Sequence, residues 1–328
     1  MFFPSLRVAI VAAATALPIW SDEVLPWERI PLPETIVQSA LRPDWVFCET
    51  PCDWRNHLST IFRPLVSDCS NAREAVLKIA GNMTSVTGVY YSMERRKHNM
   101  NAMEALSEKK VSCTGQSILL VCALRSVGIP ARAVWVMTWN HVPGNHTWAE
   151  AWVDGQWQMI EFNEKEFNTP WVMESIGMLN PDKTTQRVYA VGCATPPDAP
   201  EHPENAPAFM VEDVTERYLK LARQWYEKNG LSPEHQRILV DVSPRIETSE
   251  PVEILDARGT VISRAQLPTT RDDVRRFASL IVPRSGQHVL KTPFGIRQLT
   301  ANAARPVHII RLSRGTLTPE TRHHSSSR

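Results

Sequence analysis

The feature that most constrains the fold of this chain is an apolar segment over residues 114–127, TGQSILLVCALRSV. Its apolar side chains occupy nearly every side of a helix, which is typical of a helix buried in a core rather than packed on a surface. Gly128-Ile129-Pro130 then ends the helix, because glycine readily adopts the left-handed cap and proline cannot continue the hydrogen-bonding pattern. The sequence therefore predicts one buried helix at the centre of a domain.

Three short β-like segments follow this helix: residues 131–139 (ARAVWVMTW), 146–153 (HTWAEAWV) and 157–162 (WQMIEF). Asp154-Gly155 separates the last two and is a strong signal for a tight hairpin turn. These two segments are therefore expected to pair as antiparallel strands. A buried helix that packs on such a sheet gives an α+β fold.

The N-terminal residues have the pattern of an export signal. Residues 1–7 carry one positive charge, residues 8–16 are apolar and alanine-rich, and Ala14-Thr15-Ala16 has the small-x-small form of a cleavage site. The alternative interpretation is a buried N-terminal helix, which so short a run of small residues disfavours. We expect residues 1–20 to be a signal peptide and the protein to be secreted or periplasmic. No second apolar run approaches the roughly 20 residues that span a bilayer, so no membrane span is expected.

The C-terminal half differs in pattern from the core. Five prolines fall between residues 195 and 207, which predicts a linker over residues 196–210. Residues 211–228 have the apolar spacing of an amphipathic helix, and residues 236–312 contain short β-like runs separated by turn signals. The predicted parts are a first domain over residues 21–195, a helix plus a small all-β, sandwich-like domain over residues 211–312, and a disordered polar tail over residues 313–328.

Charge and cysteine content narrow the classes of partner and site. The chain has 36 Lys and Arg against 35 Asp and Glu, a net charge of +1, which gives no indication of nucleic acid or an anionic membrane as a partner. If the protein is exported, a disulfide among Cys48, Cys52 and Cys69 is expected, and the sequence leaves the pair open. A zinc site that combines these cysteines with His57 is disfavoured, because no second pair of ligands follows. No metal or cofactor is predicted.

Cys113 is the candidate nucleophile. It lies immediately before the apolar helix, where unpaired backbone N–H groups and the positive end of the helix dipole favour the thiolate. The same N–H groups are suited to binding an oxyanion. Gly115 in the first turn leaves room for a strand to pack closely. Cys122, in the middle of the apolar helix, is interpreted instead as a small buried hydrophobic residue.

His146 is the candidate base, because it opens the second predicted strand and can face the start of a helix packed across the sheet. His141 is a competitor, but it lies in a loop with Pro143 and Gly144, where its position is less fixed. A lone histidine is more often a satisfied surface or core residue. The assignment therefore depends on His146 and Cys113 being found together.

A third residue should be an acid that orients the imidazole and stabilises the imidazolium. Glu161 lies fifteen residues after His146, and antiparallel pairing across the hairpin can bring the two side by side. Glu164 and Glu150 are the alternatives. Each of the three could also be a solvated carboxylate.

Two stretches carry a family resemblance: VSCTGQSILLVCALRSVGIPARAV (residues 111–134) and NHTWAEAWVDGQWQMIEF (residues 145–162). Together they resemble the transglutaminase-like superfamily, in which a cysteine opens a helix, a Gly-Ile-Pro-Ala-Arg turn leads into the sheet, a His-x-Trp strand follows, and an acid comes after a tryptophan on the next strand. The match covers roughly residues 70–180. It implies a papain-like core in residues 21–195, with Cys113 as nucleophile, His146 as base and acid, and Glu161, four residues after Trp157, as the third member.

This sequence departs from the family pattern at the acid. The family usually has Asp at that position, and Glu161-Phe162-Asn163 replaces the commoner Asp-Pro-Thr. In the bacterial secreted branch that the sequence resembles, the acid falls three residues later, which would be Glu164. The resemblance thus leaves both acids open.

The combination implies a cysteine-dependent acyl-transfer enzyme that acts on a protein or peptide substrate, a peptidase or amidase that forms a thioester on Cys113. With an amine as acceptor, the same site would make a protein-crosslinking transglutaminase. A protein that binds or scaffolds without catalysis is the alternative from another class. Five tryptophans could line a substrate groove or simply pack in the sheet: Trp135, Trp139, Trp148, Trp152 and Trp157.

Overall fold

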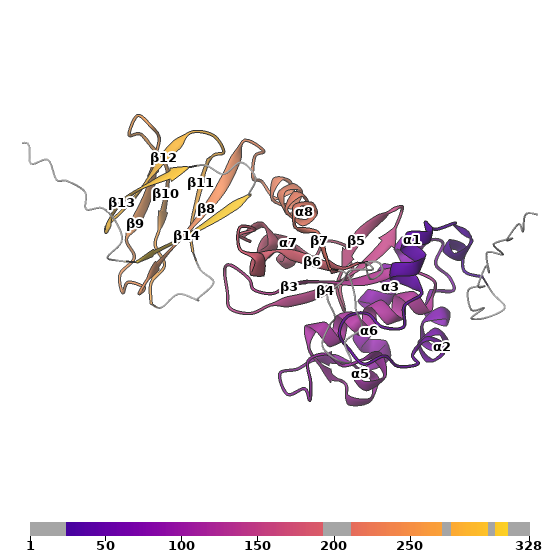
Figure 1. The fold of residues 1–328 in the computed structure, drawn as a ribbon. Helices are drawn as coiled ribbons and strands as arrows, with labels where there is room; N and C mark the ends of the chain where they lie inside the picture. The colour runs from indigo at the N-terminus through magenta and orange to yellow at the C-terminus, as the bar shows by residue number, and fades with distance from the viewer. Residues whose placement is uncertain (1–23, 193–210, 271–276, 301–305, 314–328) are drawn as a thin grey trace, which may run out of the picture.

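The computed structural model describes residues 24–192, 211–270, 277–300 and 306–313 (Figure 1). The predicted signal peptide and the proline-rich linker lie outside these residues, as does all but the first residue of the predicted tail. Within the described ranges, no helix combines the length and the apolar character that a bilayer span would need.

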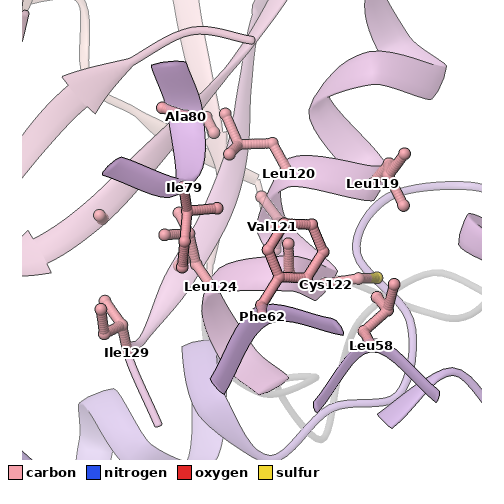
Figure 2. Close-up of a cluster of buried hydrophobic side chains, with 14 of the residues drawn as sticks. Leu58, Phe62, Ile79, Ala80, Leu119, Leu120, Val121, Cys122, Leu124 and Ile129 are labelled. Carbon is pink, nitrogen blue, oxygen red and sulfur yellow. The ribbon is translucent and has the colours of Figure 1, made fainter. Parts of the chain in front are cut away.

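The N-terminal part is a layer of helices around one buried helix, α6 (Cys113–Ser126). Figure 2 shows the side chains of Leu119, Val121 and Leu124 from α6 among Phe62 and Ile79 from neighbouring helices. Cys122 is 1% exposed, as expected of a buried hydrophobic residue. The surrounding elements are η1 (Pro26–Arg29), α1 (Glu34–Ile36), η2 (Val37–Leu41), α2 (Arg55–Val66), α3 (Ala72–Gly81), α4 (Met83–Thr87), β1 (Tyr90–Tyr91), α5 (Ala102–Glu108) and β2 (Lys110–Val111).

A five-stranded antiparallel sheet follows, in the order β5-β4-β3-β6-β7. Its strands are β3 (Ala131–Val136), β4 (His146–Val153), β5 (Gln156–Ile160), β6 (Val188–Val191) and β7 (Val211–Asp213). Asp154 and Gly155 both have positive φ, 54° and 75°, as a tight hairpin turn requires. The predicted hairpin and the predicted α+β fold are therefore confirmed.

The two faces of this sheet are covered by different helices. Ala149, Ala151 and Val153 of β4 belong to the hydrophobic cluster that contains α6. Trp148 belongs to a second cluster, with residues of α7 (Pro170–Gly177) and α8 (Thr215–Lys228). The alternation along β4 therefore directs Ala149, Ala151 and Val153 toward α6 and Trp148 toward α7 and α8, and Figure 1 shows these helices on opposite sides of the sheet.

Residues 211–228 lie with the first sheet, whereas the sequence analysis grouped them with the β domain. Val211 pairs with Val191, so β7 extends the sheet at its edge. Tyr218 and Ala222 of α8 are fully buried in the cluster behind Trp148. The amphipathic pattern predicted a helix with one buried face, but such a pattern does not identify the surface that covers this face.

The C-terminal domain consists of two β-sheets around a separate apolar core (Figure 1). The sheets have the orders β10-β9-β12-β13 and β11-β8-β14, and β14 runs parallel to β8. A small cluster that includes Tyr226 of α8 and Leu239 of β8 joins this domain to α8. The strands are β8 (His235–Ser243), β9 (Pro251–Leu255), β10 (Val261–Gln266), β11 (Ala278–Pro283), β12 (Gln287–Thr292), β13 (Gly295–Thr300) and β14 (Val307–Ser313).

The described cysteines are all free thiols, so no disulfide joins Cys48, Cys52 and Cys69 in the described part of the chain. Cys52 and Cys69 are partly or largely buried, and Cys48 is exposed. The described residues also contain no group of three or more His, Cys, Asp or Glu side chains arranged to hold a metal ion. Neither the expected bridge nor the disfavoured zinc site is present in this structure.

Candidate active site

Cys113 is the first residue of α6, at the end that carries the unpaired N–H groups. Ser112 caps the helix: its Oγ accepts the N–H of Gly115 (3.0 Å) and donates to the carbonyl of His98 (2.5 Å). Gly115 permits a close approach, because a Cβ there would lie 3.0 Å from the Cβ of Val111 in β2. The cap and the close contact fix the direction in which the Cys113 thiol points.

The surroundings of Cys113 favour its charged form. Burial on its own raises the pKa of the thiol. The hydrogen bond to His146, the charge on His146 and the backbone N–H groups of Thr147 and Thr114 act in the opposite direction, and the net pKa lies below the ordinary value. The N–H of Thr114 is part of the helix N-terminus, so the predicted contribution of the helix end is present.

His146 lies at the start of β4 and interacts with both other members of the predicted triad. Its Nε2 is 2.5 Å from Oε1 of Glu161, which leaves Nδ1 to face the Cys113 thiol. Burial lowers the pKa of the imidazole, but the hydrogen bonds and charges of Cys113 and Glu161 outweigh this and raise it to about 9. The site therefore favours a thiolate beside an imidazolium, because each charge stabilises the other.

Register explains why Glu161 reaches His146. Ile160 lies opposite Ala149 in the β4–β5 pair, so the next residue, Glu161, falls on the sheet face that His146 shares with Trp148. Its carboxyl group is largely buried, at 10% side-chain exposure. The structure thus brings together the three residues that the resemblance singled out.

The two alternative acids are placed differently. Glu164 lies in a turn, where its backbone N–H donates to the carbonyl of Glu161 (3.2 Å). Glu164 also lines the surface hollow that contains His146, but among the described residues the ion pair of His146 is with Glu161. Burial and the charges of Glu161 and Glu166 raise the pKa of Glu164. Glu150 is fully buried between Arg132 and Arg217. His141, the competing histidine, lies near Trp139 and Ser175 instead.

This geometry gives different expectations for two matched variants. Glu161→Gln removes the charge that stabilises the imidazolium of His146, so the alkylation rate of Cys113 at pH 6.5 should fall by on the order of tenfold, the equivalent of one pKa unit. Glu164→Gln makes the same chemical change one turn away and should leave the rate within about twofold of wild type. The rates are measured with iodoacetamide, by mass spectrometry of the Cys113 peptide. The opposite ranking would assign the orienting role to Glu164.

Aromatic rings enclose His146 on the sides that the triad leaves free. The ring centroid of Trp171 lies 4.6 Å from that of His146, that of Trp148 at 5.8 Å and that of Trp139 at 6.3 Å. Such rings exclude water from the His146–Glu161 pair and strengthen its electrostatic interaction. Trp171 lies at the start of α7, outside the strands, and was not among the residues predicted from the sequence. The available signal was a tryptophan directly after Pro170, a residue type that is common at the first position of a helix.

The other tryptophans divide between the cleft and the sheet. Trp135 lines the cleft, with its ring 4.8 Å from that of Phe47. Trp152 and Trp157 lie opposite each other in the β4–β5 pair, with their ring centroids 5.3 Å apart, and neither lines the cleft. Of the five tryptophans considered from the sequence, two are therefore parts of the sheet surface.

Cys113 lies where two hollows of the surface meet. The smaller, about 340 Å³, contains His146, Glu164 and Trp171, and we call it the His146 side of the cleft. The larger, about 620 Å³, contains Arg95 and Met137, and we call it the Arg95 side. Both hollows are also lined by Tyr91, Cys113, Asn145 and Thr147. An extended substrate can therefore cross the thiol with contacts on both sides of it.

A buried polar network lies behind the triad. Glu150 forms ion pairs with Arg132 (2.9 Å) and Arg217, and it accepts a hydrogen bond from the hydroxyl of Tyr218 (2.7 Å). Burial raises the pKa of Tyr218 well above its ordinary value, so this hydroxyl remains a donor. The Tyr218 hydroxyl in turn accepts the indole N–H of Trp148 (2.6 Å). Because Trp148 stacks on His146, the network connects helix α8 to the imidazole.

Residues 59–162 match the family model of the Transglutaminase-like superfamily. The matched range contains α6, the hairpin of β4 and β5, and all of Cys113, His146 and Glu161. The resemblance inferred from the sequence is thus confirmed. No curated protein matches the chain.

Solved structures share parts of the chain at low identity. One is a candidate cysteine protease from Cytophaga hutchinsonii, with 20% identity, a TM-score of 0.30, and coverage of 33% of this chain and 37% of that one. Another is described as a TGase, with 17% identity, a TM-score of 0.26, and coverage of 32% and 31%. The match to the transglutaminase of red sea bream has 10% identity and a TM-score of 0.39, and it covers 83% of this chain and 64% of that one. The chain therefore spans less than two thirds of each of these structures.

Proposed function

We propose that the protein, whose residues 59–162 match the model of the Transglutaminase-like superfamily, is a cysteine-dependent acyl-transfer enzyme, a peptidase or amidase with Cys113 as its nucleophile. One observation carries the proposal. A thiol with a lowered pKa lies beside an imidazole with a raised pKa, in the middle of a cleft that extends to both sides of it. A buried structural cysteine would have neither the charge partner nor the open surface.

The first half of the reaction follows from the charges of the pair. The Cys113 thiolate attacks the carbonyl carbon of an amide, and its own N–H, one of the unpaired amides at the helix end, is suited to donating to the developing oxyanion. His146, as imidazolium, gives its proton to the leaving amine as the C–N bond breaks. A thioester remains on Cys113 and His146 is neutral.

The second half returns the site to its starting state. Neutral His146 takes a proton from water, which attacks the thioester carbonyl, and the C–S bond breaks. The carboxylic acid product leaves, and Cys113 and His146 are again thiolate and imidazolium. Glu161 keeps the imidazole ring oriented throughout and stabilises its cationic form. An amine in place of water would give a crosslinked product by the same steps.

Trapping of the acyl intermediate tests the proposal. The protein is mixed with a peptide library, quenched in acid within seconds and digested, and the Cys113 peptide is examined for an added acyl mass. We expect acylation of Cys113 in the wild-type protein and none in Cys113→Ser. Release by water alone makes the enzyme a hydrolase, whereas release only on addition of a primary amine makes it a crosslinking transglutaminase. A Cys113 that is never acylated and alkylates no faster than a free thiol would instead favour a protein that binds without catalysis.

A further inference from the structure

The two sides of the cleft differ in charge. Of the described residues that line the Arg95 side, none is an acid, and Arg95 is the one Lys or Arg. On the His146 side, the charge of Glu161 is matched by its ion pair with His146, and Glu164 is the other acid. A substrate that crosses Cys113 thus meets a guanidinium without a carboxylate partner only on the Arg95 side.

Arg95 is held in place by neutral groups. Its Nη1 donates to the carbonyl of Ser92 (2.8 Å), and its Nη2 lies 3.0 Å from Nδ1 of His98. The guanidinium carbon is 5.8 Å from the ring centroid of Tyr91, which lines both hollows. These contacts orient the side chain but supply no negative charge.

One donor of Arg95 is left without a partner. Its Nε is shielded from solvent and makes no hydrogen bond in the structure. A buried N–H that stays unpaired costs about 1–3 kcal/mol, more for a charged group, so such groups are usually matched by a ligand or a neighbour. The unpaired N–H therefore leaves Arg95 with hydrogen-bonding capacity that no described neighbour uses.

Three neighbouring cations differ from Arg95 in having carboxylate partners. Arg96 pairs with Glu104 and Glu108, and Lys97 pairs with Glu104. Lys110, on the adjoining strand, pairs with Glu94. Within the described ranges, no carboxylate lies within salt-bridge distance of Arg95, although three glutamates of the same region pair with its neighbours.

We propose that Arg95 forms a carboxylate-binding subsite, so that the enzyme selects peptides with an acidic group on the Arg95 side of the amide that Cys113 attacks. The inference rests on the proposed function, because it uses the same cleft and the same nucleophile. A guanidinium recognises a carboxylate through charge-assisted hydrogen bonds, which are stronger than neutral ones. The acidic group is either the side chain of Glu or Asp or the terminal carboxylate of a peptide.

Affinity alkylation of Cys113 tests the subsite without requiring turnover. The probes are bromoacetyl-Glu-amide, its neutral isostere bromoacetyl-Gln-amide, and bromoacetyl-Gln with a free α-carboxylate. For wild-type protein we expect the Glu reagent to alkylate Cys113 about fivefold faster than the Gln-amide reagent, the equivalent of about 1 kcal/mol for a partly exposed charge pair. In Arg95→Gln the rates with the Glu and Gln-amide reagents should become equal.

Arg96→Gln is the matched control, because it removes the same charge one residue away and outside the cleft. It should keep the fivefold preference. A preference lost equally in Arg95→Gln and Arg96→Gln would overturn a local subsite. Equal rates for all three reagents in wild-type protein would overturn it as well. A preference confined to the free α-carboxylate reagent supports the subsite and assigns it to a chain terminus.

The same measurement separates this inference from the proposed function. If Cys113 is activated toward the Gln-amide reagent and shows no charge preference, the subsite is excluded and the proposed enzyme remains. If Cys113 reacts with every reagent only as fast as a free thiol, the proposed function fails and the subsite fails with it.

Discussion

His146→Ala is expected to lower the alkylation rate of Cys113 at pH 6.5 by up to about 100-fold, because an ordinary thiol is only about 1% thiolate at that pH. In wild-type protein the imidazole, with its pKa raised to about 9, remains cationic and stabilises the thiolate. Without it, the burial that raises the pKa of Cys113 is opposed mainly by the N–H groups of Thr147 and Thr114. Peptide turnover should fall further, on the order of 10²–10⁴-fold, because the general acid is also lost.

The alkylation rate of Cys113 and the rate of peptide turnover should depend on pH in opposite directions. The wild-type alkylation rate should already be high at neutral pH, because the pKa of Cys113 is lowered. Peptide turnover should decline above about pH 9, where His146 loses the proton that the leaving amine needs. In His146→Ala, the alkylation rate should instead be low at neutral pH and rise steadily with pH.

Cys48 provides an internal control in the same samples. It is a free thiol on a residue that is exposed as a whole, and partial burial of the thiol group together with the charge of Glu49 raises its pKa to about 11. Its alkylation should therefore be slow at pH 6.5 and identical in both proteins. If Cys113 in His146→Ala kept its reactivity at pH 6.5, the imidazole would not be the source of the activation.

Glu150→Gln is expected to destabilise the protein by about 3–5 kcal/mol, the usual cost of removing one partner from a buried ion pair. Glu150 is fully buried, and its loss of charge leaves Arg217 without its carboxylate partner among the described residues. Of its ion pairs with described residues, Arg132 would keep the one with Glu212 of β7 (2.5 Å). Glutamine preserves the shape of the side chain, so the effect reports charge rather than a cavity. Urea unfolding followed by tryptophan fluorescence measures the loss.

The control for this prediction is Glu216→Gln, on the exposed side of α8. It removes one glutamate charge from the surface and should change the free energy of unfolding by less than about 0.5 kcal/mol. Equal small effects for both variants would mean that the network around Glu150 contributes little to stability. Its connection to His146 through Trp148 would then need another explanation.

The parts of the fold that local signals specify could be predicted from the sequence. The unbroken apolar segment defined α6, and Asp154-Gly155 defined the hairpin between β4 and β5. The pairing of that hairpin also brought Glu161 toward His146, although spacing alone could not exclude Glu164. The register of β4 against β5 decides whether Glu161 or Glu164 meets His146, and that register is fixed by packing across the whole sheet.

The features that the sequence did not provide depend on contacts between distant segments. Nothing local to residues 211–228 shows that they cover the first sheet, because an amphipathic helix carries no mark of its partner. Trp171 contacts His146 across 25 residues of chain. Arg95 lies in the same region as Arg96, Lys97 and Lys110. These three residues form ion pairs with glutamates in the structure and Arg95 does not, a difference that the sequence does not show.

The late position of α8 in the chain has a consequence for biosynthesis. The nucleophile, the base and the acid have all left the ribosome by the time residue 161 emerges, yet the helix that covers the sheet behind them ends only at residue 228. Until then Trp148 and Met159 have no complete cover, and the indole N–H of Trp148 has no Tyr218 to accept it. A nascent chain that already contains Cys113, His146 and Glu161 therefore still lacks the support behind Trp148, which comes from a segment that supplies no group of the candidate site.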